Sequence, residues 1–122
     1  ADQELYEAYN LSVAQIAKHA DFLSVGTNDL TQYTMAAGRD DATVTEYYDD
    51  THSSVIRLLG IIIGDASGKP ITICGELAGR AELIPTLLEL GFRGLSISPP
   101  LIPTTKELIR SIDTRNLRAN GD

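Results

Sequence analysis

Residues 24–34 carry the sequence SVGTNDLTQYT, in which an apolar segment gives way to small and polar residues and then to a helical pattern. The apolar segment Phe22–Val25 has the length of a short strand. The polar residues at positions 27–29 are of the types that cap helices, and they predict a helix that ends near Gly38. This stretch therefore predicts one strand–turn–helix unit.

The same order recurs twice further along the chain. We expect strands at 22–25, 71–74 and 94–98, and helices at about 4–19, 30–37, 53–63, 81–90 and 103–112. Ser53 or Ser54 is expected to cap the third helix, and Pro85 favours a true start of the fourth near Ile84. Strands that alternate with helices indicate a parallel sheet, and short apolar strands indicate burial on both faces. Three strands make a small sheet, so we expect part of a larger barrel or wound sheet.

Composition excludes several classes of protein. The 122 residues suffice for one compact domain, and a net charge of −7 argues against a nucleic-acid partner. The longest apolar stretch, residues 58–63, is too short to cross a membrane. The chain opens with acidic rather than basic residues, which does not fit a signal peptide. The single cysteine, Cys74, cannot form an internal disulfide, so a reducing, cytoplasmic setting is expected.

Chemically capable residues follow the first two strands. Ligands of parallel α/β folds bind at the carboxyl ends of the strands. Asn28 and Asp29 lie there at a helix N-terminus, which favours an anion such as phosphate, and an acid beside a phosphate suggests an intervening Mg²⁺. The alternatives are that Asn28 and Asp29 only cap the helix, and that Cys74 is a buried small hydrophobe.

Several motifs occur in a characteristic order. They are GTNDLTQYT (26–34), Arg39-Asp40, Tyr48, Thr51-His52, CGELAG (74–79) and LSISPPLIPTTKELIRSI (95–112). Together they resemble the barrel of the phosphoenolpyruvate (PEP)-utilising enzymes, above all enzyme I of the bacterial phosphotransferase system. The resemblance implies the C-terminal portion of a (β/α)₈ TIM barrel, about three β/α units. Residues 1–113 would form this partial PEP-binding domain, and 114–122 a polar tail.

The resemblance also implies roles for four residues. Asn28 and Arg39 would bind the phosphate of PEP, and Asp29 would be a ligand of Mg²⁺. Cys74 would be the general acid that protonates the enolate of pyruvate at C3. Glu76 would shape the loop without a catalytic role. Each role is chemically sound, because phosphoryl transfer depends on charge neutralisation and the leaving enolate needs a proton.

The implied activity is PEP–protein phosphotransfer in the bacterial phosphotransferase system, which serves sugar transport in one branch and a nitrogen-related role in the other; the sequence leaves the branch open. The phosphoryl group would pass to a histidine and onward to a histidine-containing phosphocarrier protein, through an N-terminal domain that this sequence lacks. A cytoplasmic homodimer is implied, with no membrane or nucleic-acid partner.

The sequence departs from this family at several places. It lacks the family's second metal carboxylate and the arginines of earlier strands. Ser53 replaces a proline, and Arg80 replaces an aspartate. The changes at positions 53 and 80 are expected to affect helix starts more than chemistry. Because phosphate ligands and one metal ligand are missing, we expect the isolated chain to be inactive and to bind PEP weakly or not at all.

Two other interpretations remain open. The chain could come from pyruvate phosphate dikinase or PEP synthase, which share similar motifs. It could also be a non-catalytic barrel fragment that acts as an assembly or dimerisation module, because exposed sheet edges and apolar surface favour pairing.

Overall fold

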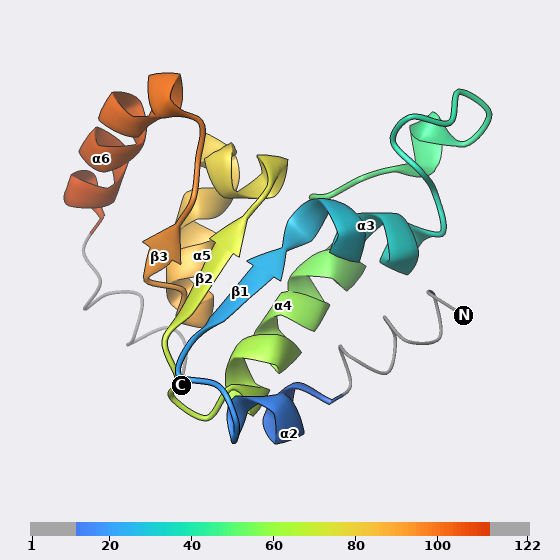
Figure 1. Ribbon diagram of the computed structural model, residues 1–122. Coiled ribbons are helices and arrows are strands. Elements are labelled where there is room, and N and C mark those ends of the chain that lie inside the picture. Colours follow the sequence, from blue (N-terminus) through green and yellow to red (C-terminus); the bar gives the residue numbers. More distant parts are fainter. Residues whose placement is uncertain (1–11, 113–122) are drawn as a thin grey trace.

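The computed structural model describes residues 12–112 and has a three-stranded sheet with helices packed against it (Figure 1). In chain order the elements are α2 (Val13–Ala17), β1 (Leu23–Gly26), α3 (Thr27–Met35), η1 (Thr45–Tyr47), α4 (Ser53–Asp65), β2 (Ile71–Cys74), η2 (Glu76–Gly79), η3 (Ala81–Leu83), α5 (Ile84–Leu90), β3 (Gly94–Leu95), η4 (Pro99–Leu101) and α6 (Ile102–Ser111). The remainder of the helix expected at 4–19 and the tail expected at 114–122 lie outside the described residues.

The sheet is parallel throughout, as the alternation of strands and helices predicted. The strands lie in the order β1-β2-β3, and Gly26 of β1 is paired with Cys74 of β2. This register brings the carboxyl ends of the two strands to the same edge of the sheet. The arrangement is a mixed α/β fold that is consistent with part of an α/β barrel.

The crossover helices α4 and α5 lie together on one face of the sheet (Figure 1). The core is formed by buried aliphatic side chains and one phenylalanine, including Val55, Leu59, Ile62, Ile71, Ile73, Leu87 and Phe92. Strand residues of the other face are exposed, as Ser24 and Thr72 show. The expectation of burial on both faces is therefore wrong for the described residues, because both crossover helices pack on the same side.

Two expected helix caps differ from the structure. The N-cap of α3 is Gly26, so Asn28 and Asp29 lie inside the first turn and their side chains do not cap it. The N-cap of α4 is His52, whose Nδ1 accepts a hydrogen bond from the backbone N–H of Ser54 at 3.1 Å. Histidine thus takes the capping role that Ser53 or Ser54 was expected to have, which leaves both serines within the helix.

The predicted end of α5 agrees with the structure, whereas the predicted end of α3 does not. Helix α5 begins at Ile84 with Pro85 in its first turn, and it ends at Leu90 with Gly91 as its C-cap, at φ 115°. Helix α3 ends before Gly38, because Ala36 adopts the left-handed conformation with φ 53°. The backbone N–H of Ala37 then bonds to the carbonyl of Gln32 at 3.1 Å and closes the helix.

The third strand is shorter than expected. It comprises only Gly94–Leu95, and the last bond to its neighbour runs from Ser96 N to Ile73 O at 2.9 Å. Pro99 and Pro100 lack the N–H groups that a longer ladder would need, and they form a turn that leads into α6. Within residues 12–112, no helix is both long and apolar enough to cross a membrane.

Candidate functional site

The polar residues at the carboxyl ends of β1 and β2 lie at the same edge of the sheet. The hydroxyl of Thr27, the first residue of α3, donates to the carbonyl oxygen of Cys74 at 2.6 Å. Thr27 is fully buried, so this bond ties the β1–α3 turn to the end of β2 from inside the protein. As a result, Asn28 lies beside the loop that begins at Gly75.

Asn28 links the two loops directly. Its side-chain Oδ1 accepts a hydrogen bond from the backbone N–H of Glu76 at 3.1 Å. This contact fixes the orientation of the carboxamide, and the Nδ2 group donates to no other atom of the described residues. Asn28, the expected phosphate-binding residue, thus has two N–H groups that could donate hydrogen bonds to a ligand.

Arg39 reaches the same place from the loop between α3 and α4, which we call the Arg39 loop (residues 36–52). Its Nη1 forms an ion pair with Oε1 of Glu76 at 3.0 Å. Both side chains are largely exposed, at 43% for Arg39 and 59% for Glu76, so water screens the pair. The sequence identified Arg39 but gave Glu76 no partner, and it is Glu76 that joins Asn28 to Arg39.

Asp29 follows Asn28 in the first turn of α3 and is exposed to solvent. Within residues 12–112, no group of three or more His, Cys, Asp or Glu side chains is arranged so that it could hold a metal ion. A single carboxylate is nevertheless compatible with Mg²⁺, which commonly keeps several waters and binds one or two carboxylates with phosphate oxygens. The described residues therefore offer one ligand of such a site.

Cys74 is half-buried at the end of β2. Its Sγ lies 3.3 Å from the backbone oxygen of Val25 and can donate to it. The hydroxyl of Ser24 lies 3.9 Å from the same sulfur. The strand alternation puts the thiol on the sheet face where Ser24 and Thr72 are exposed, so Cys74 is not a fully enclosed core residue.

Tyr48, another residue of the Arg39 loop, lies over Asn28. Its hydroxyl is 3.5 Å from the backbone oxygen of Asn28, which is a long contact. Burial raises the pKa of Tyr48, and the negative charges of Asp50 and Glu76 raise it further, while Arg39 acts in the opposite direction. The phenol is thus held in its neutral form beside the loops that meet here.

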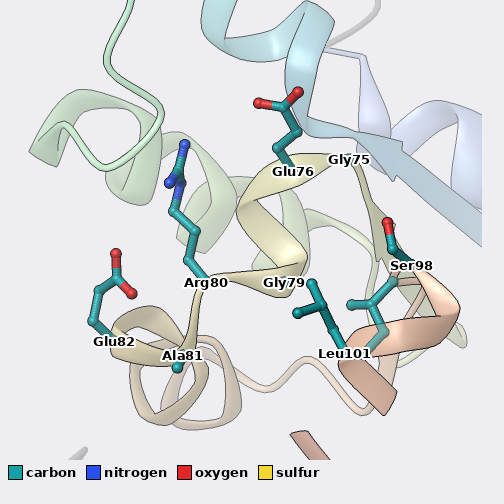
Figure 2. A pocket seen from close by; sticks show the side chains of 9 residues that line it. Gly75, Glu76, Gly79, Arg80, Ala81, Glu82, Ser98 and Leu101 are labelled. Carbon is teal, nitrogen blue, oxygen red and sulfur yellow. The ribbon is translucent and has the colours of Figure 1, made fainter. Parts of the chain in front are cut away.

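A hollow of about 460 Å³ lies next to this edge, between η2 and the turn after β3. Figure 2 shows Glu76, Arg80 and Glu82 along one side of it, and Ser98 and Leu101 on the other. The hollow thus has charged groups on one wall and mostly uncharged groups on the opposite wall.

The fold and this edge define the class of protein: a parallel α/β domain whose polar groups gather where the first two strands end. The chain belongs to the PEP-utilising enzymes, because residues 7–114 match the family described as "PEP-utilising enzyme, PEP-binding domain". The match covers most of the chain and confirms the resemblance that the motifs indicated.

Individual relatives agree. The phosphoenolpyruvate-protein phosphotransferase of Streptococcus equinus is 41% identical over 106 residues, which are 85% of this chain and 18% of the relative. Multiphosphoryl transfer protein 2 of Escherichia coli K12 is 38% identical over 108 residues, 87% of this chain and 13% of the relative. The phosphotransferase of Enterococcus faecalis is 40% identical over 110 residues, 88% and 19% respectively. The chain thus spans less than a fifth of the length of these relatives.

Proposed function

We propose that this chain is the C-terminal part of the PEP-binding barrel of a PEP–protein phosphotransferase. The observation that supports this most directly is the meeting of three segments at Glu76. Its backbone N–H binds Asn28, and its carboxylate binds Arg39. An amide donor and a guanidinium beside a helix N-terminus suit a phosphate, because both supply N–H groups and one supplies positive charge.

In this proposal each residue has a distinct task. The Nδ2 group of Asn28 donates to a phosphate oxygen of PEP, and Arg39 exchanges Glu76 for the phosphate. Asp29 holds Mg²⁺ together with ligands from outside the described residues, and the metal, when bound, neutralises charge on the phosphate. These groups bind and orient PEP and leave the chemical step to others.

The proton step falls to Cys74. When the phosphoryl group leaves for a histidine, the P–O bond breaks and its electrons remain on the enolate oxygen of pyruvate. The Sγ–H bond of Cys74 then breaks, and its proton forms a C–H bond at C3, giving pyruvate and a thiolate that solvent reprotonates. A half-buried thiol can act as this acid.

The wider setting is proposed on the same basis. The phosphoryl group passes from the histidine to a phosphocarrier protein, in a cytoplasmic homodimer that serves sugar transport. The relatives cited above are named as phosphotransferases or multiphosphoryl transfer proteins, which favours this reading over pyruvate phosphate dikinase or PEP synthase.

Calorimetric titration with PEP, with and without Mg²⁺, tests the proposal. The full-length protein should bind PEP only when Mg²⁺ is present, and Arg39→Gln should weaken that binding. The isolated chain should bind weakly or not at all, because it supplies only part of the ligands. A full-length protein that binds no PEP would refute the proposed function, and micromolar binding by the isolated chain would refute its dependence on outside ligands.

A further inference from the structure

Asp50 is the only charged residue among residues 12–112 that is buried, with 3% of its surface exposed. It lies at the end of the Arg39 loop, two residues before the N-cap of α4. A buried carboxylate is costly unless other groups compensate its charge. The residues around Asp50 must therefore compensate its charge.

Arg80 provides this compensation. Its Nε donates to Oδ1 of Asp50 at 2.8 Å, and this bond raises the pKa of Arg80 further above its usual value. Oδ2 of Asp50 accepts no hydrogen bond within the described part of the chain. Arg80 is 38% exposed, so one end of the pair is enclosed and the other is open to solvent. The burial of Asp50 thus depends on a single arginine.

The pair joins the two segments that carry the candidate phosphate site. Arg80 is the residue that follows η2, and Glu76 is the residue that begins it. Glu76 contacts Arg39, and Arg80 contacts Asp50, so the Arg39 loop is tied to η2 near both of its ends. The exposed pair at Arg39 contributes little by itself, whereas the enclosed pair at Asp50 is the stronger constraint.

Position 80 needs a side chain that can balance the charge of Asp50, and Arg80 supplies it. An aspartate at this place would put a second negative charge beside the buried Asp50, and like charges at this distance repel. The charges at positions 50 and 80 are thus complementary in this chain.

We propose that Asp50 and Arg80 are positioning residues that hold the Arg39 loop against η2, so that Arg39 is kept beside Glu76 and Asn28. Neither residue needs to touch the substrate. Their ion pair sets the place of the guanidinium that binds the phosphate, and in this respect the inference rests on the proposed function. Loss of the pair should release the loop and weaken PEP binding without impairing the acid at Cys74.

The experiment uses Arg80→Gln in the full-length protein, with Arg57→Gln as the matched control. Arg57 is an exposed arginine of α4 with no ion pair in the described residues, so it controls for the loss of one positive charge. Arg80→Gln should raise KM for PEP at least about tenfold with kcat little changed, because a misplaced binding group costs affinity steeply. Arg80→Lys, which keeps the charge, should recover part of that loss.

A second readout follows the loop without any substrate. Trypsin cleaves after Arg39, and mass spectrometry can follow this single bond during limited digestion. Faster cleavage at Arg39 in Arg80→Gln than in Arg57→Gln, at equal thermal stability, would support the proposal. If wild-type protein binds no PEP, the proposed function fails, while this assay still decides whether the ion pair holds the loop.

Arg80→Gln leaves a buried charge without a partner and could unfold the protein. The double variant Asp50→Asn, Arg80→Gln avoids this, because two neutral groups can share a hydrogen bond without a buried charge. It should also show raised KM and faster cleavage at Arg39. A folded double variant with wild-type KM and wild-type cleavage would overturn the proposal, as would a loss of stability without either change.

Discussion

The side-chain oxygen of Asn28 accepts a hydrogen bond from the backbone N–H of Glu76, 48 residues later in the chain, at 3.1 Å. This bond joins the first turn of α3 to the loop after β2. It gives Asn28 a structural role in addition to the phosphate contact that we propose, and the two roles use different atoms of the same carboxamide. They can therefore be separated by substitution.

Asn28→Ala and Asn28→Asp form a matched pair for this purpose. Alanine removes both the acceptor and the donors, so it should cost about 1 kcal/mol of unfolding free energy and also weaken PEP binding. Aspartate keeps an acceptor for the N–H of Glu76 but replaces the donors by a negative charge. We expect near-normal stability and lost PEP binding, measured by chemical denaturation and calorimetry. Normal PEP binding by the aspartate variant would contradict the assignment of Nδ2 as the phosphate donor.

Cys74→Ala should separate binding from turnover. The thiol is proposed to act only after the phosphoryl group has left, so PEP binding should persist while pyruvate formation falls by roughly 10²–10⁴-fold, the usual contribution of a general acid. Calorimetry and a pyruvate assay on the full-length protein measure the two quantities. Cys74→Ser, which keeps a weaker proton donor of similar size, is the companion variant. Unimpaired pyruvate formation by the alanine variant would remove Cys74 from the mechanism.

Glu76→Gln should have the opposite effect to Arg39→Gln. If Arg39 binds the phosphate of PEP as we propose, the carboxylate of Glu76, with which it is paired, competes for it and adds negative charge nearby. Its removal should strengthen PEP binding several-fold, with the gain largest at low salt. Because the ion pair is exposed, the unfolding free energy should change by no more than about 1 kcal/mol. Weaker PEP binding by Glu76→Gln would mean that Glu76 helps to place Arg39 rather than competing for it.

The place of Asn28 and Cys74 in the fold could be predicted from the sequence, whereas the contacts within the candidate site could not. The strand–turn–helix order places Asn28 and Cys74 at the carboxyl ends of neighbouring strands, and this requires only local patterns. The bond from Glu76 to Asn28 depends on the register that pairs Gly26 with Cys74. That register is set by packing between distant segments, so no local pattern reveals it.

Asp49 and Asp50 show that burial, too, cannot be predicted from the local sequence. Asp49 is exposed and accepts hydrogen bonds from Thr51, two residues later, as turn-forming aspartates commonly do. Asp50 is enclosed and depends on Arg80, 30 residues later. The two side chains are chemically identical, so only the tertiary structure distinguishes them. No local pattern in the sequence pairs Arg80 with Asp50 rather than with Asp49.

Gly75 is required for the approach of the two loops. Its φ of 103° is one that other residues rarely adopt, and a β-carbon there would collide with Oγ1 of Thr27 and lie 3.1 Å from Oδ1 of Asn28. Gly75→Ala should therefore cost roughly 1–3 kcal/mol or more. Gly64→Ala is the control, since Gly64 lies in α4 with open space around it and alanine there should stabilise the helix by up to about 1 kcal/mol. Thermal unfolding measures both, and equal effects would contradict the argument.

Ionisation of Tyr48 should lower the unfolding free energy at alkaline pH. Burial, followed by the charges of Asp50 and Glu76, raises the pKa of Tyr48 above its ordinary value of 10.0. A group whose pKa is higher in the folded state stabilises the fold fully below its unfolded pKa, and this contribution is lost as the pH rises through the folded pKa. The unfolding free energy of the wild type should therefore fall more steeply above pH 10 than that of Tyr48→Phe.

Chemical denaturation between neutral pH and pH values above 10 measures this difference, with Tyr47→Phe as the control. Tyr47 is the exposed neighbour of Tyr48, so its variant controls for the loss of a hydroxyl group from the same loop. The advantage of the wild type over Tyr48→Phe should shrink as the pH rises, because the tyrosinate is disfavoured beside two carboxylates and phenylalanine cannot ionise. Parallel curves for the wild type and Tyr48→Phe would contradict the raised pKa of Tyr48, and with it the burial of the phenol beside Asp50 and Glu76.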